Sequence, residues 1–143
     1  MRRLALLAAL VLAGPAWALD YLSVAEPAVM YDAPSAKARP LFAIAPGTPV
    51  EAVVTLDAWV KVRDPKGDLA WIEKRFLSQQ RTVMVKADRA QVYAQPDDKS
   101  PLVFEAAKDV VLEFVEPGPL GWAKVRHRDG QGGFIKASQV WGL

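Results

Sequence analysis

One pattern of 15 residues occurs twice in this chain, and it constrains the fold more than any other feature. Residues 59–73 (WVKVRDPKGDLAWIE) and 122–136 (WAKVRHRDGQGGFIK) both begin with Trp, continue through Lys-Val-Arg, pass a Gly and end near an aromatic residue and Ile. The two copies start 63 residues apart, and a shift of 62 also aligns Tyr31 with Tyr93. An internal repeat of this extent predicts two copies of one structural unit.

The alignment continues between these landmarks and needs one inserted residue. The further matches are Phe42 with Phe104, Glu51 with Glu113, Val53 with Val115 and, after the insertion, Asp64 with His127. The extra residue falls in 116–121, opposite 54–58 in the first copy. Because turns absorb changes in length, we expect a turn at both places.

Each copy has the alternating pattern of short β-strands. In the two Lys-Val-Arg segments, period two buries Val62 and Val125 and leaves Lys61 and Lys124 on the outward face. Gly residues within 64–68 and 127–133 are typical of hairpin turns. We expect one short helical turn after each return strand, and Thr82–Val85 as the first strand of the second copy. Many short strands joined by tight turns predict an all-β fold of two tandem small barrels.

The N-terminal segment is predicted to be a signal peptide. Two Arg precede an apolar run of ten residues (4–13), and Ala16-Trp17-Ala18 has the small-x-small pattern of a cleavage site. The predicted organisation is therefore a signal peptide at 1–18, one barrel at 20–80 and a second at 81–143. The apolar run is shorter than the roughly 20 residues of a membrane span. We expect a periplasmic or secreted protein with no membrane insertion after cleavage.

Charge argues against a nucleic-acid partner. Of the 18 Lys and Arg, two lie in the predicted signal, so 16 remain against 16 Asp and Glu. Nucleic-acid-binding domains usually carry a strong basic stripe, and a formally neutral chain lacks that excess.

The order of motifs resembles the bacterial SH3 (SH3b-like) domains. In both copies a Tyr and a Pro-containing turn precede a Val-Glu strand, Trp-x-Lys-Val-Arg, a Gly turn, an aromatic-Ile pair and a short helical turn. The resemblance covers about residues 21–143, and it is looser in the first copy, where Leu-Ala-Trp replaces Gly-Gly-Phe. It is closest to exported tandem bacterial SH3 proteins of the Gram-negative type. It implies SH3-like barrels of five to six strands, whose relatives often bind cell-wall peptides or accompany cell-wall enzymes.

The chemistry of cell-wall enzymes is mostly missing from the composition. The chain has no Cys for a thiolate nucleophile and a single His, His127, whereas zinc hydrolases commonly use several. His127 lies between two Arg in a predicted turn, which favours a solvated side chain. The acidic residues are scattered through turns and outward positions. We therefore expect a protein that is not an enzyme and that uses no cofactor or metal.

The candidate ligand-binding residues are aromatic and basic. Trp59 and Trp122 are predicted on the outward face, although a small barrel can also fold such a Trp over one end of its core. The full candidate set is Trp122, Lys124, Arg126, Arg128, Tyr93, Trp59 and Tyr31. If one copy binds a ligand, we expect the second, because its Trp has more cations nearby and Gly130, Gly132 and Gly133 would let a ligand approach the backbone.

Three other aromatic residues have structural interpretations. Trp71 and Phe134 follow the Gly turns and are predicted to lie in the core or at the interface between the two copies. Trp141 has no partner in the first copy and either closes the second barrel or packs on the first.

Two functional hypotheses follow. The first is a non-catalytic binding or adaptor module that recognises peptidoglycan peptide or an envelope protein. The second is a structural interaction protein whose aromatic surface supports self-association or a fixed complex. An open groove with a polar edge would favour the first, and a flat apolar patch the second.

Overall fold

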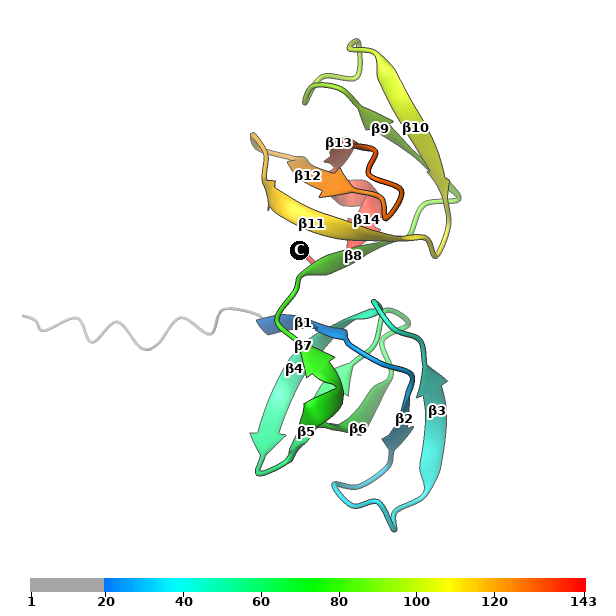
Figure 1. Cartoon of the computed structure of the whole chain (residues 1–143), viewed down its shortest axis with the longest axis vertical. Coiled ribbons are helices and arrows are strands. Elements are labelled where there is room, and N and C mark those ends of the chain that lie inside the picture. Colours follow the sequence, from blue (N-terminus) through cyan, green and yellow to red (C-terminus); the bar gives the residue numbers. More distant parts are fainter. Residues whose placement is uncertain (1–19) are drawn as a thin grey trace, which may run out of the picture.

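The computed structural model describes residues 20–143, so the predicted signal peptide lies outside the described residues. The described chain is all-β, with two seven-stranded antiparallel sheets (Figure 1). The first contains β1 (Asp20–Val24), β2 (Ala28–Tyr31), β3 (Pro40–Ile44), β4 (Pro49–Leu56), β5 (Trp59–Arg63), β6 (Leu69–Glu73) and β7 (Leu77–Ser78). The second contains β8 (Thr82–Val85), β9 (Arg89–Tyr93), β10 (Leu102–Ala107), β11 (Val111–Pro117), β12 (Trp122–Arg126), β13 (Gly132–Lys136) and β14 (Val140–Trp141).

The two sheets have the same topology, which confirms the repeat. Their strand orders are β3-β2-β6-β5-β4-β1-β7 and β10-β9-β13-β12-β11-β8-β14. A single 3-10 turn, η1 (Lys74–Phe76) or η2 (Ala137–Gln139), precedes the last strand of each. Each sheet has one or two strands more than the resemblance implied, because the chain after this turn pairs back onto the first strand through two further residues. We call the two units the first and second barrel.

Each barrel has its own core, and the predicted strand phase is confirmed. Val62 and Val125 are fully buried, whereas Lys61 and Lys124 are half-buried on the opposite face. The first core is built from Val24, Ala28, Met30, Ile44, Val50, Val60, Val62, Ala70 and Ile72. The second is built from Val83, Val85, Ala90, Val92, Ala106, Leu112, Ala123, Val125, Ile135 and Val140.

The turns lie where the sequence predicted them. Gly67 and Gly130 adopt φ values of 90° and 97° in the two hairpins after the Lys-Val-Arg strands. Only Gly adopts such φ values without steric strain, which explains why both copies keep a Gly there. The inserted residue falls in the β11–β12 connection, opposite the tighter β4–β5 turn.

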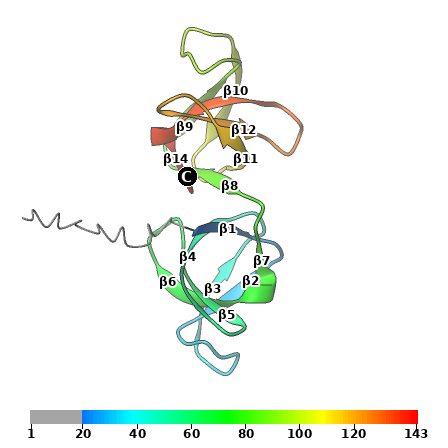
Figure 2. The ribbon, with the colours of Figure 1, turned by 90° about the vertical axis from the view of Figure 1, so that its left-hand side faces the viewer.

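The barrels meet end to end through a short linker (Figures 1 and 2). In both views β1 and β8 lie at the junction, and the C-terminus is beside it. The Thr82 hydroxyl donates a hydrogen bond of 2.6 Å to the Gly47 carbonyl, and the Ser23 hydroxyl donates one of 2.6 Å to the Gln80 carbonyl. Both alternatives for Trp141 are correct: in β14 it pairs with Met84 and completes the second sheet, and its ring meets that of Tyr21 on the first barrel edge to face at 5.4 Å.

None of the helices in residues 20–143 is long and apolar enough to cross a membrane.

Candidate functional site

The same aromatic pair is built once on each barrel. The rings of Tyr31 and Trp59 meet edge to face with their centroids 5.6 Å apart, and those of Tyr93 and Trp122 do so at 6.1 Å. All four side chains are half-buried. Each Trp begins the strand whose inward residues form the core, so period two places it on the outer surface.

Trp71 and Phe134 belong to these outer surfaces, and the interpretation of them as core or interface residues is wrong. On β6 the buried residues are Ala70 and Ile72, and Trp71 between them is half-buried on the opposite face. Trp71 lies in register with Lys61 on one side and Tyr31 on the other. Phe134 occupies the equivalent position between Lys124 and Tyr93. Neighbouring strand residues point to opposite faces, and the adjacent Ile in each copy takes the inward position.

Each barrel therefore carries an outward set of three aromatic side chains. We call Tyr31, Trp59 and Trp71 the first aromatic face, and Tyr93, Trp122 and Phe134 the second aromatic face. The alternation in residues 69–73 already contained this information, because Ile72 and Trp71 cannot both point inward.

The borders of the two aromatic faces differ in polarity. Beside the first, Val54, Leu56 and Leu69 are 47%, 49% and 42% exposed. At the position of Val54 the second barrel has Glu116, in register with Lys124, and at the position of Leu69 it has Gly132. At these positions the first face is therefore bordered by apolar side chains, and the second by a charged side chain and by a residue without a side chain.

One lysine contacts the Trp122 ring on the second aromatic face, and Lys124 lies two residues along the same strand. Lys136 Nζ lies 5.9 Å from the centre of the Trp122 ring, within the range of a cation–π contact. Lys124 Nζ lies 3.6 Å from a Glu116 oxygen, and Lys136 Nζ 3.5 Å from an Asp98 oxygen. All four charged groups are exposed enough for a ligand to compete for them.

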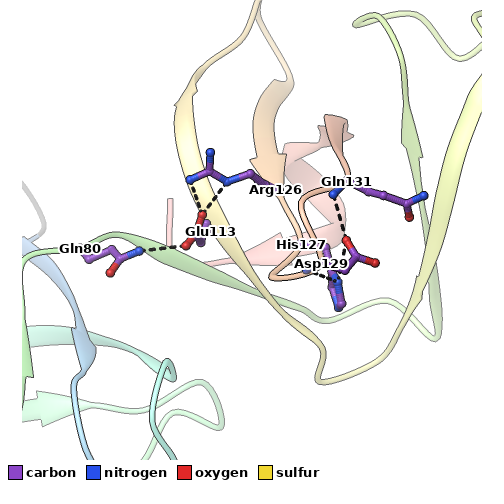
Figure 3. Close-up of polar contacts among 6 residues, drawn as sticks. All are labelled: Gln80, Glu113, Arg126, His127, Asp129 and Gln131. Carbon is purple, nitrogen blue, oxygen red and sulfur yellow. Dashed lines mark hydrogen bonds and ion pairs between the residues drawn. The ribbon is translucent and has the colours of Figure 1, made fainter.

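Arg126 has a structural partner. Its Nε and Nη2 lie 2.8 and 2.7 Å from Glu113 Oε2, and the Gln80 side chain donates to the other oxygen of Glu113 at 3.0 Å (Figure 3). Arg63 and Glu51 form the equivalent pair at 3.6 Å in the first barrel. The repeated Arg of the Lys-Val-Arg motif thus holds two strands together, and in the second barrel it also connects to the linker.

Arg128 lies away from the Trp122 ring, so the structure does not bring the whole candidate set together. Trp122 begins β12, and Arg126 ends it about 13 Å further on at 3.3 Å per residue. Arg128 follows in the turn, where it lines a groove at the junction with Ser23 and Thr82.

His127 is part of its own turn. Its Nδ1 accepts a hydrogen bond of 3.3 Å from the Asp129 backbone, and its ring meets Phe104 at 6.0 Å. The Gln131 backbone N–H donates to the Asp129 carboxylate (Figure 3). This hydrogen bond, followed by the His127 contacts, holds the pKa of Asp129 below its usual value.

Two of the glycines expected to admit a ligand serve the barrel instead. A Cβ at Gly133 would overlap the carbonyl oxygen of Tyr93, and one at Gly132 would lie 2.9 Å from that of Val125. A Cβ at Gly130 would meet nothing within 4 Å. The interpretation of Gly132 and Gly133 as room for a ligand is therefore wrong.

Arg81 is a junction residue that the sequence did not single out. Its Nη2 donates a hydrogen bond of 2.7 Å to the Gly142 carbonyl, and its guanidinium lies 5.4 Å from the Tyr21 ring and 5.0 Å from the Phe114 ring. It thus contacts both barrels, although it lies in a polar linker with no motif of its own.

Within residues 20–143, no group of three or more His, Cys, Asp or Glu side chains is arranged to hold a metal ion.

Comparison with known families identifies the class of protein. The family model described as bacterial SH3 domain matches residues 24–79 and again 86–142. The chain belongs to this family, with two tandem copies of the domain. No curated protein matches the chain.

Several solved structures are similar at low identity. NlpC2 and NlpC1 from Trichomonas vaginalis share 13% and 14% identity, with TM-scores of 0.39 and 0.40. An NlpC/P60 family protein from Bacillus cereus ATCC 10987 shares 15%, with a TM-score of 0.39. The matches cover 88%, 92% and 84% of this chain and 49%, 48% and 55% of those chains. The chain thus spans about half the length of these structures.

Proposed function

We propose that this protein is a non-catalytic binding module that recognises cell-wall peptide in the periplasm or outside the cell. The observation that carries the proposal is the aromatic pair of Tyr and Trp built twice, once on the outer surface of each barrel. The core of each barrel is complete without these rings. Their repetition at the surface therefore supports a role in recognition.

The second aromatic face is the better candidate for an anionic ligand. Two lysines lie on the Trp122 side of this face. Lys124 is in register with Glu116, and Lys136 lies close to Asp98. In the first barrel Glu73 replaces Lys136 and pairs with Arg75 at 2.9 Å. Wall peptides carry free carboxylates, which the lysines would attract while Trp122 supplies apolar contact.

The test is binding of the folded protein and its variants to purified peptidoglycan. We expect Trp122→Ala to weaken sedimentation with sacculi, and to weaken binding in titrations with muropeptides by about 1–2 kcal/mol. Trp59→Ala is the matched control and should have the smaller effect. Circular dichroism checks that both variants fold. Normal binding by folded Trp122→Ala would place the site elsewhere, and unfolding of that variant would make Trp122 a packing residue.

Export has a separate test. The proposed location requires the mature chain to begin at Leu19, after the predicted cleavage site. Mass spectrometry of the native protein from a periplasmic fraction measures this directly. An intact N-terminal Met1 or Arg2, or recovery in the membrane pellet, would overturn it.

A structural role in self-association is the second candidate. It is favoured by the exposed Val54, Leu56 and Leu69 that border the first aromatic face. Sedimentation velocity would then detect a dimer that Leu56→Ser and Leu69→Ser together abolish. A monomer at every concentration tested would exclude this candidate.

A further inference from the structure

The groove between the two barrels borders the open edge of β3. It has a volume of about 710 Å³ and lies apart from both aromatic faces. One wall consists of four consecutive residues, 42–45, at the end of β3. Successive side chains of a strand point to opposite faces, so a lining that includes Phe42, Ala43 and Ile44 reaches both faces of β3 and borders the edge of its C-terminal half. β3 is the terminal strand of its sheet and pairs only with β2.

β3 is unusually apolar for a strand whose outer edge is unpaired. Its sequence Pro-Leu-Phe-Ala-Ile has no charged residue, and Leu41 and Phe42 are 38% and 39% exposed. Edge strands are normally blunted by charges or covered, because their free N–H and C=O groups pair readily with other chains. In the second barrel the equivalent β10 carries Glu105, which pairs with Arg89 at 3.4 Å.

The repeat supplies a direct comparison for Phe42. Its counterpart Phe104 packs against the second core and meets the ring of His127. In the first barrel Asp64 replaces His127, and its Oδ1 accepts hydrogen bonds from the backbone of Lys66 and Asp68. Phe42 thus lacks the aromatic cover that Phe104 has, and it is left open to the groove.

The opposite wall and the rim suit an extended chain with both apolar and charged side chains. Met84 and Trp141 of the second barrel line the same groove, so its lining has apolar side chains besides Phe42. The exposed charged residues of the lining are Lys66, Lys86, Lys108, Asp68 and Asp109, whereas Asp64 is buried. Among residues 20–143, none of these five forms an ion pair with another side chain.

We propose that this groove binds an extended segment of a partner protein, which adds as a strand to the edge of β3 and places an apolar side chain against Phe42. The volume lies in the range of sites that hold a single small ligand or chain segment, and a second folded copy of this protein is too large to enter. Strand addition supplies main-chain hydrogen bonds, and the pockets beside the strand select alternate side chains. The protein would then hold a partner protein at a surface separate from the aromatic faces.

The experiment uses a phage-displayed library of random seven-residue peptides, selected on the purified protein. Selected peptides are then titrated against wild type, Phe42→Asp and Leu102→Asp. Leu102 is the matched control, because it is 51% exposed on the equivalent edge strand of the second barrel and does not line this groove. We expect the selected peptides to alternate apolar and polar residues. Phe42→Asp should weaken their affinity for the protein at least about tenfold, and Leu102→Asp should leave that affinity unchanged.

Amide hydrogen exchange distinguishes strand addition from side-chain docking. A bound peptide should slow exchange at residues 41–45 and leave residues 102–107 unchanged. Circular dichroism of Phe42→Asp checks its fold, and Phe42→Ala is the milder variant if the first is unfolded.

Three outcomes would overturn the proposal. One is a selection that enriches no peptide above a blank surface. Another is equal binding of the peptides to Phe42→Asp or Phe42→Ala and wild type, or binding without slower exchange in β3. The third is a Phe42-dependent dimer in sedimentation velocity, which would show that Phe42 belongs to an interface between two copies of this protein. Because Trp122 is not involved, sacculus binding can fail while this groove still binds peptide.

Discussion

Tyr21 shows how one side chain responds to the junction between the barrels. It is half-buried against Trp141 and lies beside Arg81. Burial raises the pKa of Tyr21 above its usual value, and the Glu51 carboxylate raises it further, against the opposing influence of Arg81 and Arg63. The neutral phenol is therefore the form that the folded protein favours.

This shift predicts a loss of stability at high pH. A folded-state pKa above the unfolded value contributes stability that is complete below the unfolded pKa, about 10 for Tyr. The contribution is lost as the pH rises through the folded pKa. We expect the urea midpoint to fall as the pH rises above about 10, the unfolded pKa, and to fall less in Tyr21→Phe. An equal fall in both proteins would show that Tyr21 does not ionise with a raised pKa.

The strands themselves give a second prediction, which concerns the two equivalent valines. Val62 and Val125 are fully buried in separate cores, so Val→Ala at either position should cost about 1–3 kcal/mol through lost burial and a cavity. Lys61→Ala and Lys124→Ala, one residue away on the outer face, should change stability by about 0.5 kcal/mol or less. Denaturant unfolding of the four variants measures this. Larger losses at the lysines than at the valines would contradict the strand phase.

The strands were predictable because their information is local. Alternation of side chains placed Val62 inside and Lys61 outside, and the Gly of each hairpin marked its turn. The second copy repeats the same alternation and the same Gly turn, which supports the prediction independently. The same rule also placed Trp71 outside, but its neighbourhood in the sequence, between Ala70 and Ile72, looked like core.

The candidate site was less predictable, because it depends on contacts between strands. The pairing of Tyr93 with Trp122 joins segments 29 residues apart, and no local pattern states that their rings meet. Arg126 resembled a ligand-binding cation in the sequence, but the register of β11 and β12 places it opposite Glu113. The exposure of Phe42 depends on residue 64, which is Asp in the first barrel, whereas the equivalent His127 meets the ring of Phe104 in the second.

At the scale of the whole molecule, two small cores depend on each other. A domain of about 60 residues buries only about 60% of its unfolded surface, so each barrel is marginal by itself. The junction adds the hydrogen bond from Thr82 to Gly47, the contact of Trp141 with Tyr21, and Arg81 beside both Tyr21 and Phe114. The Nε of Arg81 is buried without a hydrogen-bond partner, which reduces what this residue contributes.

The junction predicts that each barrel is less stable alone than in the full chain. We expect fragments 20–80 and 81–143 to fold as β-proteins with lower thermal midpoints than the full chain. If the junction contributes about 1–2 kcal/mol, the difference should be several degrees, because 1 kcal/mol shifts a domain of this size by roughly 4–8 °C. Arg81→Ala in the full chain should lower the midpoint by less than separation of the barrels does. Differential scanning calorimetry measures all four proteins, and Lys61→Ala, away from the junction, is the control. Equal midpoints for the fragments and the full chain would mean that the barrels are energetically independent, since the contacts at Thr82, Trp141 and Arg81 would then add nothing measurable to either core.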